Sequence, residues 1–122
     1  MIINIQQIVY EALRDQISTY SVYTCPCDTM QMPYILIRSI ITSTLPYSQE
    51  LHKYEKIDML ITVYDKPYSN KNCLQTLEQM QETINNLLKT LNNIFNISII
   101  IETNHNPQSF SGDLKLSFYY IS

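Results

Sequence analysis

Residues 57–64 read IDMLITVY, and this stretch decides which kind of fold the chain can adopt. Every second residue is apolar, beginning at Ile57 and continuing through Met59, Ile61 and Val63. A period of two is typical of a β-strand that turns one face toward a core and the other face outward. The chain must therefore supply other elements that cover the apolar face.

Two amphipathic helices are predicted to cover that face, one before the strand and one after it. From residue 5 to residue 17, apolar side chains recur at steps of three and four, which places them on one stripe of a helix. The second helix begins near Asn70 or Asn72, since either residue suits an N-cap. Its stripe extends over about five turns and consists of Leu74, Leu77, Met80 or Gln81, Ile84, Leu87, Leu88 and Leu91. Because burying one leucine contributes about 2 kcal/mol, we expect a charge at Leu88 to unfold the domain.

Four further strands are indicated by runs of β-branched and aromatic residues. They span residues 22–25, 34–42, 96–103 and 114–121. Pro26 ends the first strand, and the continuously apolar start of the second should be buried on both faces. The order α-β-β-β-α-β-β predicts an α+β fold: an antiparallel (mixed) sheet of about five strands, packed by two helices on one side.

Two polar segments are predicted as loops. Residues 43–54, which include Pro46, read as a mobile loop or the tip of a hairpin, where insertions would be tolerated best. Residues 105–112 connect the last two strands and are too many for a two-residue turn.

Length and composition fit a single domain with one core, spanning residues 1–122. The chain has 122 residues, of which 45% are hydrophobic and 16% are charged. Eight lysines and arginines against eleven acidic residues give a formal charge of −3, without a basic cluster. Direct binding of nucleic acid is therefore not expected, since neutralising phosphates requires grouped basic residues.

Neither membrane insertion nor export is indicated. The longest apolar runs, such as residues 97–101, are far shorter than the ~20 residues that a transmembrane helix needs. The opening MIINIQQ lacks the basic region and the uninterrupted apolar region of a signal peptide. We expect the protein to stay in the cytoplasm of the cell that makes it.

The cysteines do not predict a disulfide, a metal site or a nucleophile. Cys25, Cys27 and Cys73 are an odd number in a chain without an export signal, so free thiols are expected. A metal would have to join the single close pair to scattered partners such as His52 or His105. No nucleophile signature is present, and a single glycine excludes a glycine-rich phosphate loop. We expect no cofactor, no metal and no enzymatic activity.

The surplus of tyrosine points instead to contacts between proteins. The chain has ten tyrosines, more than one small core needs, and tyrosine is enriched at interfaces. Half-buried strand tyrosines are the alternative explanation for any one of them. The acidic pair Glu78 and Glu82 should face solvent on the second helix. The candidate interface residues are Tyr47, Tyr54, Tyr64, Tyr68, His105 and Phe110.

The order of motifs resembles the phage tail-terminator family, also described as tail-completion or minor tail proteins. The resemblance covers nearly the whole chain and rests on two pieces between the helices. One is Met32-Pro33-Tyr34-Ile35-Leu36-Ile37, and the other is the strand end Ile61-Thr62-Val63-Tyr64-Asp65. The family commonly has Val-Trp where this chain has Val63-Tyr64.

The resemblance implies a structural protein of the virion tail, assembled in the cytoplasm of the host bacterium. Such a protein forms a ring, commonly a hexamer, on the last ring of the tail tube. It ends tube growth and offers a surface to the head connector or completion protein. Residues 43–54 and 105–112 are the expected contact loops, and the acidic charge of the ring would keep it from gripping passing DNA.

Two other functions stay open at this point. One is a head-completion or connector adaptor, which would share the lack of chemistry and bind partners on the portal side. The other is a small cytoplasmic ligand-binding or toxin-like enzyme domain. A deep pocket lined with tyrosine and a buried histidine would identify the latter.

Overall fold

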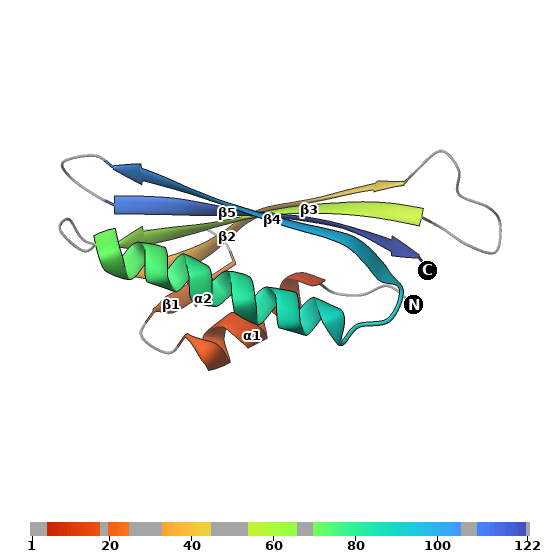
Figure 1. The fold of residues 1–122 in the computed structure, drawn as a ribbon, viewed down its shortest axis with the longest axis horizontal. Coiled ribbons are helices and arrows are strands. Elements are labelled where there is room, and N and C mark those ends of the chain that lie inside the picture. The colour runs from red at the N-terminus through yellow and green to blue at the C-terminus, as the bar shows by residue number, and fades with distance from the viewer. Residues whose placement is uncertain are drawn as a thin grey trace.

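The computed structural model describes residues 5–17, 20–24, 33–44, 54–65, 70–105 and 110–121. In this part of the chain, a five-stranded sheet forms one layer and two helices form a second layer on one of its faces (Figure 1). The elements are α1 (Ile5–Gln16), β1 (Ser21–Tyr23), β2 (Tyr34–Thr44), β3 (Tyr54–Asp65), α2 (Asn70–Lys89), β4 (Ile94–His105) and β5 (Phe110–Ile121). Their order confirms the predicted α+β class.

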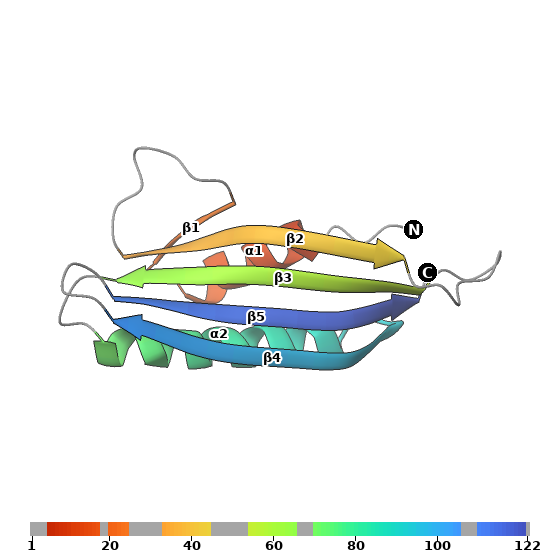
Figure 2. The ribbon, with the colours of Figure 1, turned by 90° about the horizontal axis from the view of Figure 1, so that it is seen from above.

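The sheet is mixed, with strand order β1-β2-β3-β5-β4 (Figure 2). Only β1 is parallel to its neighbour, β2, and every other pair in the described sheet is antiparallel. The chain crosses from β3 through α2 to β4, and β5 then folds back between β3 and β4. Helix α2 packs on β3, β5 and β4, while α1 packs on α2, β1 and β2.

The core lies between the helices and the sheet, and it confirms most of the predicted pattern. All four alternating residues of β3 are buried, and α1 contributes Ile5, Val9 and Leu13. The start of β2 is buried on both faces, at Ile35, Leu36 and Ile37. From α2 the core receives Leu77, Met80, Ile84 and Leu88, with Leu87 and Leu91 half-buried.

Leu74 is the exception to the predicted stripe of α2, because its side chain is 43% exposed. At 3.6 residues per turn, Leu74 is rotated by roughly 80° from the direction of Ile84, so it points past the edge of the buried stripe. Met80, and not Gln81, is the fully buried residue of that turn. The helix begins at Asn70, which places Asn72 inside its first turn and excludes Asn72 as the N-cap.

Both predicted loops are shorter than expected. The pairing of β4 with β5 extends to His105 and Phe110, so only residues 106–109 separate the strands, and the prediction of a loop over 105–112 was wrong. In the same way, Ser43 and Thr44 pair with β3, which begins at Tyr54. Polar residues continue these strands because the ladder bonds the backbone and does not require apolar side chains. The stretch between residues 45 and 53 lies outside the described residues.

Two irregularities set which side chains of the outer strands reach the core. The pairing shifts between Ile37 and Ser39 in β2, and between Phe95 and Ser98 in β4. Each shift adds one residue to the strand and reverses the alternation beyond it. Asn96 sits in the second irregularity with a φ of 54°, a left-handed conformation that asparagine tolerates well. As a result, the isoleucines that follow in β4 at odd positions pack on the helix side.

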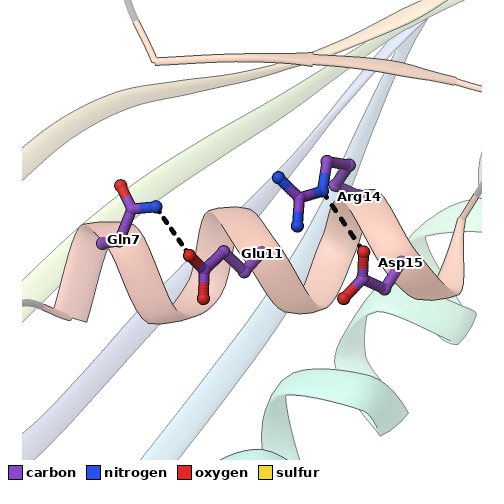
Figure 3. A network of polar contacts seen from close by, with 4 residues as sticks. All are labelled: Gln7, Glu11, Arg14 and Asp15. Carbon is purple, nitrogen blue, oxygen red and sulfur yellow. Dashed lines mark hydrogen bonds and ion pairs between the residues drawn. The ribbon is translucent and has the colours of Figure 1, made fainter.

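Two exposed pairs of residues on α1 make polar contacts (Figure 3). On α1, Gln7 Nε2 donates to Glu11 Oε1 at 2.8 Å, and Arg14 Nε lies 3.2 Å from Asp15 Oδ1. The hydrogen bond and charge of Asp15 raise the pKa of the Arg14 guanidinium. These exposed pairs lie on the outer surface of α1 and contribute little to the stability of the fold.

Candidate interface surface

The face of the sheet opposite α1 and α2 is the candidate functional surface, and we call it the open face. Strand alternation places on it every side chain that lies between two core-facing neighbours. It carries aromatic, aliphatic and charged residues together: Tyr34, Leu36, Ile41, Lys56, Asp58, Leu60, Thr62, Tyr64, Phe95, Ser98, Ile100, Glu102, Asp113, Lys115, Ser117 and Tyr119. No helix of the described chain covers this face (Figure 1).

Three tyrosines form a cluster at one end of the open face. The rings of Tyr34 and Tyr64, on the paired strands β2 and β3, stack with centroids 4.8 Å apart. Tyr23 from β1 meets Tyr34 edge-on, with centroids 5.9 Å apart. Burial, and then the neighbouring Tyr64 and Tyr23, raise the pKa of the Tyr34 phenol. The hydroxyl group of Tyr34 therefore stays protonated and neutral.

A second aromatic pair marks the opposite end of the open face. Phe95 on β4 stacks on Tyr119 of β5, with centroids 5.5 Å apart and the ring planes 19° from parallel. The irregularity in β4 makes this contact possible, since Phe95 precedes the added residue and pairs with Tyr119.

Between the two aromatic groups, the open face is hollowed and apolar. The hollow has a volume of about 390 Å3, and its walls include Ile41, Leu60 and Ile100. Ile41 is 59% exposed and Ile100 is 52% exposed, which is unusual for isoleucine in a strand. Lys115 Nζ lies 3.1 Å from Glu102 Oε2 at its rim, so charges of both signs surround the apolar floor.

A polar contact near the tyrosine cluster is shielded from water. Thr62 is 2% exposed although it lies on the open face, and its Oγ1 donates to Asp113 Oδ1 at 2.7 Å. Leu36, its neighbour on β2, is also buried. The tyrosine end of the open face is thus already packed, whereas the middle around Leu60 is not.

A second hollow lies between the helices, and most of its lining residues are polar. It encloses about 580 Å3, and Asp15, Gln16, Gln79, Glu82 and Asn86 are among its lining residues. Gln79 Nε2 donates to the backbone oxygen of Gln16 there, which ties α2 to α1. Among the described residues that line the two hollows there is no tyrosine and no histidine.

The predicted interface residues are only partly brought together. Tyr64 belongs to the tyrosine cluster, and the backbone places Phe110 and His105 at the same end of the sheet. Tyr54 lies at the other end of β3, where it is half-buried opposite Ile121. Tyr47 and Tyr68 lie outside the described residues.

The prediction of free thiols is not tested, because the cysteine side chains lie outside the described part of the chain. Cys25, Cys27 and His52 are outside it, and for Cys73 only the backbone in α2 is described. Among the described residues, no three side chains of His, Cys, Asp or Glu gather as metal ligands. The acidic pair Glu78 and Glu82 faces solvent, as predicted.

Sequence reasoning missed the exposed isoleucines Ile41 and Ile100. Each lies in a continuous apolar run, Ile40-Ile41 or Ile99-Ile100-Ile101. Since consecutive strand residues point to opposite faces, one member of such a run must face away from the helices. The alternation within these apolar runs could therefore have identified both residues.

No family model matches the chain, and no curated protein matches it in sequence. Its fold is similar to that of a chain in a solved structure described as "Virion of native gene transfer agent (GTA) particle". The two superpose with a TM-score of 0.55 at 12% sequence identity, over 96% of this chain and 94% of that chain. At this identity the similarity shows a shared fold, extending from end to end of both chains. No helix in the described residues is long and apolar enough to cross a membrane.

Proposed function

We propose that this protein is a structural component of a virion, and specifically a tail terminator that caps the tail tube. The observation that carries the proposal is the end-to-end likeness of its fold to a chain of the gene transfer agent virion. The sequence resemblance to tail terminators, based on the Pro33-Tyr34 strand and the Val63-Tyr64 strand end, gives the narrower role. The two arguments are independent, because one uses backbone geometry and the other uses local sequence.

The proposed protein works by contact and without catalysis. It assembles as a ring of identical copies, hexameric in the proposed form, on the last ring of the tube protein. One surface stops further tube subunits from adding, and another receives the head connector or completion protein. The open face supports such a role, since its exposed isoleucines and stacked aromatic rings are the residue types that interfaces bury.

A tube-length assay tests the proposal. The purified chain is added to the candidate tail-tube protein during polymerisation, and tube lengths are measured by negative-stain electron microscopy. We expect shorter tubes with the added protein at one end. The Leu88→Asp variant, which we expect not to fold, is the matched control and should leave tube length unchanged. Tubes of unaltered length, with no protein at their ends, would contradict the proposal.

The same samples distinguish a terminator from a connector adaptor. An adaptor would bind portal-side proteins and leave tube growth unaffected. Light scattering after size exclusion then reports whether the chain binds the tube protein, the connector protein or both. Binding to the connector protein alone would replace the terminator with the adaptor.

A further inference from the structure

Among the described strands, the sheet has a backbone edge without a partner strand on each side. On one side, β4 pairs only with β5 among the described strands. On the other side, β1 covers β2 only at residues 34–36, and from residue 38 to residue 44 the described partner of β2 is β3 alone. Unpaired strand edges are templates for another strand. Figure 2 shows these two edges on opposite sides of the sheet.

The two edges have the right polarity to pair with each other in neighbouring copies. β2 is antiparallel to β3, β3 to β5, and β5 to β4, so β4 runs opposite to β2. When a second copy is placed beside the first with its sheet in the same orientation, β4 of one copy lies antiparallel to β2 of the next. Antiparallel pairing continues the pattern of the sheet without reversing any strand.

Exposed apolar residues lie where such pairing would cover them. Three large hydrophobic side chains of the described chain are strongly exposed, and two of them, Ile41 on β2 and Ile100 on β4, lie on these strands. Both point to the open face. If Ile100 is opposite Ile41 of the next copy, then Ile101 is opposite Ile40 on the helix-covered face, where both are half-buried. Pairing would thus bury apolar contacts on both faces of the sheet.

Length and charge fit the same register. When Ile100 lies opposite Ile41, residues 97–103 of β4 pair with residues 38–44 of β2. The β4 stretch begins just after its irregularity, and the β2 stretch begins just after the part that β1 covers. The single charged residue of the first stretch is Glu102 and that of the second is Arg38. In this register they lie on adjacent residue pairs, so a positive and a negative charge come to the same end of the paired stretch.

We propose that β4 of one copy adds to the free part of β2 in the next copy, joining their sheets head to tail. This inference rests on the proposed function, because it assigns the interface that builds the ring. A head-to-tail contact uses two different surfaces, so a growing row of copies keeps one free edge at each end until the ring closes. A pairing of β4 with β4 of a second copy would instead stop at a dimer.

Lysine substitutions at each edge test the pairing, since a lysine on an edge strand opposes strand addition. Ile41→Lys blocks β2, where its cross-strand neighbour Asp58 favours the new charge. Ile100→Lys blocks β4 opposite Lys115, and Ser98→Lys, opposite Ser117, replaces it if thermal melting shows that Ile100→Lys does not fold. Leu74→Lys is the matched control, because it changes the third exposed hydrophobic residue, on the helix layer.

The measurement is solution mass by light scattering, for each variant alone and for an equal mixture. We expect the wild type and Leu74→Lys to form the same closed oligomer, and each edge variant alone to be monomeric. The mixture should give a dimer, because the intact β4 edge of Ile41→Lys can join the intact β2 edge of Ile100→Lys.

Three results would overturn head-to-tail pairing. The first is a wild type that remains monomeric, and the second is a pair of edge variants that still form the wild-type oligomer. The third is an Ile41→Lys variant that dimerises alone, which would indicate pairing of β4 with β4. The tube-length assay is a separate measurement. If the protein caps tubes but its copies do not pair through these edges, the proposed function stands and the edge-pairing inference fails.

Discussion

The two faces of one sheet differ in almost every respect, although the same long strands build both. The helix-covered face presents Ile61, Val63, Leu114 and Leu116, all with almost no exposure. The open face presents tyrosines, serines, charged pairs and two exposed isoleucines between those same residues. The residues that form the core and the residues that are available for contacts thus lie on different faces. Substitutions on the covered face should change folding, and substitutions on the open face should change contacts.

The largest effect is expected from Leu88→Asp on α2. Leu88 is 1% exposed, and an unpaired buried carboxylate costs several kcal/mol. We expect the domain to be unfolded at 25 °C by circular dichroism. Leu74→Asp, on the exposed side of the same helix, is the control and should melt close to the wild type. A folded Leu88→Asp variant would contradict the expectation that the residues packed between the helices and the sheet are required for folding.

Phe118 and Tyr119 are adjacent in β5 and lie on opposite faces of the sheet, so substitutions at these two positions compare the faces. Phe118 is fully buried against the helices, so Phe118→Ala should lower the free energy of unfolding by about 3–5 kcal/mol. Tyr119→Ala removes one ring of the stack with Phe95 and should cost about 1 kcal/mol. Urea denaturation measures both. Equal losses would mean that the open face also holds the fold.

Thr62 tests the one place where the open face is packed. Thr62→Val keeps the shape of the side chain and removes its hydrogen bond to Asp113, which should cost about 1.5 kcal/mol. Thr62→Ser retains a hydroxyl group and is expected to lose less. If urea denaturation gives the opposite order, the methyl group matters more than the hydrogen bond.

The smallest effect is expected at the rim of the hollow. Lys115 and Glu102 are each about half exposed, so Lys115→Gln should change the free energy of unfolding by no more than about 0.5 kcal/mol. Melting in low and high salt measures it, and the difference between the variant and the wild type should shrink as salt screens the pair. A loss that persists in high salt would point to packing of the lysine stem.

The fold was largely predictable because its elements are local patterns. The alternation at residues 57–64 and the stripe around Ile84 each follow from one periodicity, and both were confirmed. The longer strands were predicted too short, because backbone pairing includes polar residues such as Thr44 and His105 in the ladder. The first strand was predicted to reach residue 25, and it ends at Tyr23. Sequence gave no measure of how far that pairing would extend.

The sequence predicted that the protein has an interface, but it did not predict which residues lie together on it. An excess of tyrosine indicated interfaces, and Tyr64 does lie in a cluster with Tyr34 and Tyr23. Which tyrosines meet depends on the register of β2 with β3, and the register depends on one added residue near Ser39. Such an irregularity leaves no periodic mark in the sequence, so the pairs could not be assigned.

The sequence by itself determined which residues are apolar and at what spacing, and therefore the helices, the strands and the buried faces of α1, α2 and β3. Only the tertiary structure decided the strand order, which placed β5 between β3 and β4 and left β4 at an edge. The physical reason is the range of the interactions. Periodicity acts within one element, whereas strand order and register depend on contacts between segments far apart in the chain.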